Sequence, residues 1–264
     1  MKKVVLQIVF IVLGIIYHTC EAQDTLRIIT YNIDQGSDTT LQAIGELIRT
    51  YNPDFVALQE VDMYPSRDYV PQQHHKNFMA ELSYYSNMQG VFGKAFDHPG
   101  GWDYGNAILT KHSFTKSESF KLPSSRGMET RGLLLIHTSI KGHPVCFACT
   151  HLSYESKNIR TLQLQKIKQL MRKQKENIQF VCGDFNSDIS EDIVFPIMKQ
   201  WKDALPENQN TFSSQPNNSY RLYKYDYILY NCKKTKKIKV LSNTIKCDEH
   251  YTDHCIGIVD IIIP

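Results

Sequence analysis

The feature of this sequence that most constrains its fold is a set of short apolar segments that end in polar side chains. Six segments with the composition of β-strands each lie beside an acid, an amide or an imidazole. These polar residues are Asn32, Glu60, His151, Asp184 with Asn186, Asp226, and Asp253 with His254. Strand ends in layered α/β proteins are rigid and aim side chains well, so sites are usually built there. The pattern therefore predicts one polar site assembled from residues far apart in the chain.

Each of these residues, taken alone, has an ordinary structural explanation. Asn32 and Asp184 are typical of turns in which the side chain bonds its own backbone. Glu60 fits a solvated strand end, and either histidine fits a polar position at the edge of a core. The joint pattern favours a site, because apolar strands have no structural reason to end in this mixture.

The order of the segments indicates an α/β protein. Strands are expected over residues 26–31, 55–58, 106–110, 132–138, 145–150, 178–182, 225–230 and 256–263. Helices are expected over residues 39–50, 75–85 and 159–172. The length of 264 residues and the hydrophobic content of 42% fit one domain with a substantial core. Two packed sheets with helices outside account for this order.

The first 22 residues have the pattern of a secretory signal peptide. Lys2 and Lys3 precede a short apolar run over residues 4–17, and Cys20 and Ala22 have the spacing of a cleavage site. Cleavage would leave residues 23–264 as a secreted or periplasmic protein. Lipidation of Cys20, which would make an outer-membrane lipoprotein, is the alternative.

The remaining cysteines and the net charge give weaker information. Cys146, Cys149 and Cys182 lie in apolar, strand-like segments, which favours buried thiols. Cys232 and Cys247 flank a basic segment and form a candidate disulfide in an oxidising compartment, although sequence alone does not set the connectivity. The net charge of +3 neither indicates nor excludes a nucleic-acid partner.

The mixture of polar residues suits the hydrolysis of phosphate esters. That reaction needs charge neutralisation at the phosphoryl oxygens and a positioned water. Mg²⁺ prefers oxygen ligands and is often held by one or two carboxylates. The sequence lacks the Cys-rich spacing of a zinc site, so Mg²⁺ is the expected cofactor, with Mn²⁺ as the second candidate.

Seven motifs in order resemble the endonuclease/exonuclease/phosphatase superfamily, whose members are similar to deoxyribonuclease I. The motifs are Thr30-Tyr31-Asn32-Ile33, Leu58-Gln59-Glu60-Val61-Asp62, Tyr104-Gly105-Asn106-Ala107-Ile108-Leu109, Thr150-His151-Leu152, Gly183-Asp184-Phe185-Asn186-Ser187, Tyr225-Asp226-Tyr227-Ile228 and Thr252-Asp253-His254. The resemblance spans Thr30 to Asp260 and is that of a small secreted bacterial-type member. It implies a four-layer α/β/β/α sandwich with two packed mixed β-sheets.

The resemblance also implies roles for the matching residues. Glu60 would bind the metal, with Asn32 and Asp253 close to it. Asp184 would orient or activate water, and His254 would act as a base or as a charged phosphate contact. The remaining implied roles are phosphate positioning by Asn186, orientation of His254 by Asp226, charge stabilisation by His151, and substrate binding by Asn106 and Arg131. The resemblance leaves open whether Asp184 or His254 is the general base.

The same superfamily cuts very different phosphate esters, so the resemblance does not name the substrate. A nucleic acid, a phospholipid head group, as for a sphingomyelinase, and a small phosphate ester all remain candidates. A monomer without an obligate protein partner is expected. A catalytically silent binding module that kept the fold is the alternative, and the intact set of acids and histidines argues against it.

Overall fold

The computed structural model describes residues 25–214, 221–233, 238–248 and 251–264. The expected signal peptide over residues 1–22, including Cys20, therefore lies outside the described residues. In the described part of the chain, no helix has the length and apolar character needed to span a membrane.

Two six-stranded mixed sheets form the centre of the molecule. The first has the order β13 (Lys239–Lys246), β14 (Ile256–Ile262), β1 (Thr25–Asn32), β2 (Phe55–Met63), β4 (Asp103–Thr110), β3 (Gln89–Asp97). The second has the order β5 (Phe114–Lys121), β6 (Gly132–Ile140), β7 (His143–His151), β8 (Ile178–Asp184), β12 (Asp226–Cys232), β9 (Lys202–Asp203). The pairs β1–β2 and β7–β8 are parallel, and the other neighbours are antiparallel. A short hairpin-like pair joins β10 (Phe212–Ser214) to β11 (Arg221–Tyr223).

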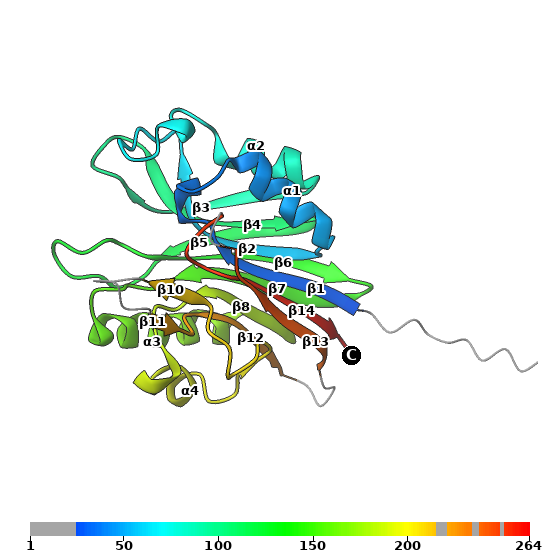
Figure 1. Ribbon diagram of the computed structural model, residues 1–264. Coiled ribbons are helices and arrows are strands. Elements are labelled where there is room, and N and C mark those ends of the chain that lie inside the picture. Colours follow the sequence, from blue (N-terminus) through cyan, green and yellow to red (C-terminus); the bar gives the residue numbers. More distant parts are fainter. Residues whose placement is uncertain (1–24, 215–220, 234–237, 249–250) are drawn as a thin grey trace, which may run out of the picture.

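Four layers result from three apolar clusters. The central cluster lies between the sheets, where the rings of Phe55 and Phe147 stack at 4.8 Å. A second cluster buries the outer face of the first sheet under α1 (Leu41–Tyr51) and α2 (Phe78–Ser86). A third buries the outer face of the other sheet under α3 (Lys157–Lys173) and α4 (Val194–Ile197). Figure 1 shows these helix pairs on opposite sides of the two sheets, which confirms the predicted sandwich.

Local sequence accounts for the helix ends. The Thr40 side chain accepts the N–H of Ala43 at the start of α1, and Asn52 closes that helix in the left-handed conformation. At the start of α3, the Ser156 side chain accepts the N–H of Ile159. The last turn of α3 carries Arg172 and Lys173, whose positive charges suit the negative end of the helix dipole. The helices predicted over residues 39–50 and 159–172 are therefore present within two residues of the observed ends.

The candidate disulfide between Cys232 and Cys247 is not formed, because Cys247 is bonded to Cys255. Cys247 directly follows β13 and Cys255 directly precedes β14, and in this antiparallel pair Lys246 lies opposite Ile256. The register thus places the two cysteines across from each other, with Cα atoms 4.2 Å apart. Cys232 ends β12 in the other sheet and is a free thiol.

Candidate active site

The topology brings the polar strand ends to one edge of the sandwich. Parallel strands β7 and β8 end together, so His151 lies directly across from Asp184. Strand β12 is antiparallel to β8 and starts at the same edge, where Asp226 is the partner of Asp184. In the first sheet, β1 ends at Asn32 beside the parallel strand β2. The antiparallel strand β14 begins there, just after His254.

One buried amide connects the two sheets. The Asn32 Nδ2 donates to Glu60 Oε1 at 3.0 Å and to Asp184 Oδ2 at 3.1 Å. Glu60 has a φ of 61°, at the point where the register between β2 and β4 shifts. A bulge of this kind turns a side chain out of the regular ladder, and strained backbone of this type clusters at functional sites. The bulge therefore aims Glu60 at the edge where Asp184 lies.

Asp184 lies between two imidazoles. Its Oδ2 is 3.4 Å from His151 Nε2 and 3.5 Å from His254 Nε2, while its Oδ1 accepts the Asn186 N–H at 2.8 Å. Burial raises the pKa of Asp184 to about 6, and His254 opposes that rise. Gly183 precedes it with a φ of +147°, and a Cβ there would lie 1.9 Å from the Thr150 carbonyl oxygen. Only glycine allows the two strands to approach this closely.

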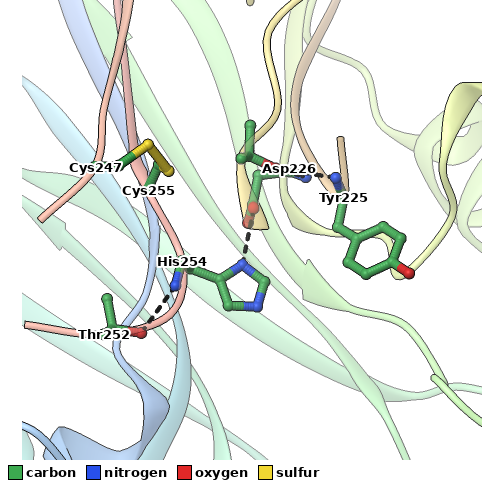
Figure 2. Close-up of a disulfide and its surroundings, with 7 residues drawn as sticks. Tyr225, Asp226, Cys247, Thr252, His254 and Cys255 are labelled. Atoms are coloured by element: carbon green, nitrogen blue, oxygen red, sulfur yellow. Dashed lines mark hydrogen bonds and ion pairs between the residues drawn. A yellow bond between two sulfur atoms is a disulfide. The ribbon is translucent and has the colours of Figure 1, made fainter. Parts of the chain in front are cut away.

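His254 is held as a cation by its carboxylate neighbours. Its Nδ1 lies 2.9 Å from Asp226 Oδ2, and Asp226 is fully buried. Burial disfavours the charged imidazole, but Asp226 and Asp184 outweigh this effect and raise the pKa of His254 to about 10. Figure 2 shows the imidazole turned toward Asp226, with the Cys247–Cys255 disulfide on its other side.

His151 is the neutral counterpart of His254. Burial and the charge of Arg131 hold the pKa of His151 well below its usual range. Arg131 Nη1 lies 3.0 Å from His151 Nδ1, and a guanidinium only donates, so Nδ1 accepts. A neutral ring with an accepting Nδ1 keeps its proton on Nε2, and that N–H faces the Asp184 carboxylate at 3.4 Å.

Glu60, Arg131, His151, Asp184, Asn186 and His254 line a cavity of about 620 Å³. Its wall carries charges of both signs, from the acids Asp34, Glu60, Glu129, Asp184, Glu191 and Asp253 and from Arg67, Arg131 and Arg160. Tyr69 and Tyr154 line it with exposed rings. An adjoining cavity of about 760 Å³ shares Phe212, Asp253 and His254, so His254 lies in the wall between the two.

Sequence and structure comparisons identify the relatives of this chain. A family model described as the endonuclease/exonuclease/phosphatase family matches residues 29–238. The chain belongs to the endonuclease/exonuclease/phosphatase family. Members of this family are hydrolases that act on phosphoester bonds. No curated protein matches the chain by sequence.

Solved structures share the family fold at low sequence identity. A family protein from Bacteroides vulgatus superposes with a TM-score of 0.70 at 19% identity, over 92% of this chain and 100% of that one. One from Beutenbergia cavernae gives a TM-score of 0.71 at 18% identity, over 90% and 72%. A mannosyl-6-phosphatase from Bacteroides thetaiotaomicron gives 0.64 at 17% identity, over 90% and 100%. At these identities the likeness concerns the fold.

Two clusters of acidic side chains in this protein could hold a metal ion. Asp184, Asp226 and His254 place ligand atoms within 4.8 Å of one another, but the His254–Asp226 hydrogen bond already uses two of these atoms. Glu60 and Asp34 both face the cavity. Burial raises the pKa of Glu60 to about 7 and that of Asp34 to about 6. A divalent cation would offset this unfavourable burial, and the oxygen donors suit Mg²⁺.

The structure brings most of the predicted site residues into one network. Direct contacts link Asn32, Glu60, Arg131, His151, Asp184, Asn186, Asp226 and His254. Asp253 lies on the cavity wall beside them. Asn106 is placed differently, because it is buried and its Nδ2 donates to the Gly132 carbonyl at 3.0 Å.

Asp34 is a residue of the site that the sequence did not single out. Asp34 reaches the cavity because it has a φ of 42° and its N–H donates to Asn32 Oδ1 at 3.0 Å. Its spacing of two residues from Asn32 was the available signal. Tyr104 belongs to the third of the seven motifs, and its hydroxyl accepts from Arg131 Nη1 at 3.2 Å.

Proposed function

We propose that this protein is a secreted, Mg²⁺-dependent hydrolase of phosphate esters, with Mn²⁺ as an alternative metal. The observation that carries the proposal is the position of Asp184. Its carboxylate lies 3.5 Å from His254 Nε2 and 3.4 Å from His151 Nε2, and it shares the Asn32 amide with Glu60. An acid between a cationic and a neutral imidazole can orient a water while its neighbours contact the phosphate.

The protonation states favour Asp184 as the general base. His254, with a pKa raised to about 10, holds its proton at neutral pH and so suits a charged contact to a phosphoryl oxygen. The pKa of Asp184 is raised to about 6 by burial, which makes it a better proton acceptor near neutrality than an ordinary carboxylate. Asp184 would thus take the proton of the attacking water.

Neighbouring donors would stabilise the charge that develops on the phosphoryl oxygens. His151 presents Nε2–H next to Asp184, and Asn186 is fixed by donation to the Leu152 carbonyl at 3.0 Å. Arg131 lies on the cavity wall and adds a full positive charge. Fixed donors of this kind need no reorganisation during the reaction.

Glu60 would hold the metal, with Asp34, Asn32 and Asp253 close to it or to its waters. When bound, the metal would neutralise charge on the phosphate. The donor set is made of oxygens, and the raised pKa values of Glu60 and Asp34 reflect buried carboxylates that a cation would stabilise.

The residues around the catalytic groups bear on the class of substrate. Arg67, Tyr69 and Tyr104 form one side, and the Arg67 guanidinium lies 5.9 and 5.6 Å from the two tyrosine rings. Tyr104 is buried, but the rings of Tyr69 and Tyr154 are exposed in the cavity lining. Exposed rings beside a phosphate site suit a ring-bearing ester, such as a sugar phosphate or a nucleotide. Because a mannosyl-6-phosphatase shares this fold, sugar phosphates should be tested first. Nucleic acid and sphingomyelin remain in the panel, and a monomer is expected.

A substrate panel tests this proposal. DNA, RNA, sphingomyelin, nucleotides, inositol phosphates and sugar phosphates would each be incubated with Mg²⁺ and with a chelator, and phosphate or product release measured. We expect Mg²⁺-dependent hydrolysis of at least one ester, abolished by Glu60→Ala. No release from any ester would favour the silent binding module, whereas release that does not respond to the chelator would refute the metal dependence.

Secretion is tested separately. The full-length chain expressed in a bacterial host is expected outside the cytoplasm with Gln23 at its N-terminus, as read by intact mass. A lipid-modified Cys20 would support the lipoprotein alternative instead.

A further inference from the structure

A buried threonine outside the sequence motifs connects the backbone on both sides of the Asp226–His254 pair. Thr211 directly precedes β10 and is fully buried. Its hydroxyl oxygen accepts the N–H of Tyr225 at 3.0 Å and the N–H of Asp226 at 2.9 Å. Its carbonyl oxygen accepts the N–H of Cys255 at 2.7 Å. One residue is thus bonded to Asp226 itself and to the residue that follows His254.

The start of β12 needs this hydroxyl. Strand β9 pairs with β12 only at Leu229 and Tyr230, so it does not reach the N–H groups of Tyr225 and Asp226. Buried N–H groups without an acceptor are costly, and a side-chain oxygen is the usual substitute where a strand pair ends. The Thr211 hydroxyl serves both donors and so fixes the backbone that carries the Asp226 carboxylate.

The His254 side is fixed through the same short segment. Phe212 forms an isolated antiparallel bridge with His254, and Ser213 N–H donates to the Asp253 carbonyl at 3.1 Å. The rings of Phe212 and His254 are 4.7 Å apart. The Cys247–Cys255 disulfide ties the residue that follows His254 to the residue that follows β13 (Figure 2). The backbone around His254 is therefore fixed both by this segment and by the disulfide at Cys255.

From these contacts we infer that Thr211 is a positioning residue, which sets the separation of the Asp226 carboxylate from the His254 imidazole. This inference rests on the proposed function only in assuming that Asp226 and His254 take part in ester hydrolysis. Thr211 acts through Asp226 and His254. Since a misplacement of 1 Å at a reacting group can slow a reaction about 100-fold, a small backbone shift would be measurable.

The test compares Thr211→Val, which keeps the shape and loses the acceptor, with Thr211→Ser, which keeps the acceptor. The matched control is Thr138→Val, because Thr138 is also buried and its hydroxyl donates to the Ser113 carbonyl at 2.7 Å. We expect Thr211→Val to lower kcat by about 10–100-fold with little change in KM. Thr211→Ser should restore kcat, and Thr138→Val should leave it unchanged. Should the valine variant fail to fold, Thr211→Ala takes its place.

A second readout needs no substrate and separates this inference from the proposed function. The Nδ1–H proton of His254, hydrogen-bonded to Asp226, is expected as a downfield proton NMR signal that Asp226→Asn shifts or removes. Thr211→Val or Thr211→Ala should weaken or move this signal, whereas Thr211→Ser and Thr138→Val should not. An unchanged signal and an unchanged kcat in the folded valine or alanine variant would overturn the inference. A changed signal in a protein that hydrolyses no ester would support the inference and refute the proposed function.

Discussion

Replacing Asp226 by Asn should separate the chemical step from substrate binding. Asp226 is fully buried behind His254, and its Oδ2 is 2.9 Å from His254 Nδ1. The substitution keeps the shape and removes the charge. Among the groups that favour the charged imidazole, Asp226 makes the largest contribution to the raised pKa of His254. Without it, His254 should lose much of its positive charge at neutral pH.

The expected loss of kcat follows from the raised pKa of His254 together with the usual contribution of a charged contact to a rate. A rise from 6.5 to about 10 corresponds to roughly 5 kcal/mol in favour of the protonated imidazole, summed over all its neighbours. A positioned proton donor or charged contact contributes about 10²–10⁴-fold to a rate. We therefore expect Asp226→Asn to lower kcat by about 10²–10⁴-fold, with KM changed only a few-fold because Asp226 does not reach the substrate.

Steady-state kinetics on the best ester of the panel would measure this, with Asp203→Asn as the control. Asp203 is another buried acid next to β12, and it pairs with Lys224 at 2.6 Å. Breaking that pair should lower the melting temperature, because a buried charge loses its partner, and should leave kcat nearly unchanged. Equal losses of kcat in both variants, or a wild-type kcat in Asp226→Asn, would refute the reasoning.

Three further predictions concern the metal, pH and the disulfide. Glu60→Gln should weaken Mg²⁺ binding by at least about tenfold, as measured by calorimetry; Glu46→Gln on α1 should not, and equal Mg²⁺ affinity in the two variants would contradict the assignment. Because the pKa of His254 is raised, the protonated imidazole contributes its full stabilisation of the fold below pH 6.5 and loses it as pH rises to about 10. The free energy of unfolding should fall over this range in the wild type and should fall less in His254→Gln. An equal fall in both proteins would contradict this assignment. Cys255→Ser opens a cross-link between residues eight apart and should lower the free energy of unfolding by about 2–3 kcal/mol, whereas Cys232→Ser should leave the denaturant midpoint unchanged.

The sequence predicted the interior of the sandwich better than its edges. The central strands carry continuous apolar runs because both of their faces are covered, as in residues 55–58 and 180–182. Strands β3, β5, β9 and β13 lie at the four sheet edges and were not predicted. Strands β5 and β13 expose polar side chains along most of their length, so they lack the apolar pattern on which strand prediction depends.

The site residues at strand ends had a signal in the sequence, whereas those fixed by long-range contacts did not. Thr211, for example, depends on three separate segments that meet around it. The Cys247–Cys255 bond depends on the register of β13 against β14, which sequence spacing does not set. The protonation difference between His151 and His254 likewise depends on which charges surround each buried ring.

The most direct test of the central claim is the rate of ester hydrolysis by Asp184→Asn, beside the wild type, with Mg²⁺ at neutral pH. Asp184 contacts both histidines and shares the Asn32 amide with Glu60, so the account makes it the centre of the site. We expect the folded variant to lose at least about 100-fold in kcat. A folded Asp184→Asn variant with the wild-type rate would contradict it.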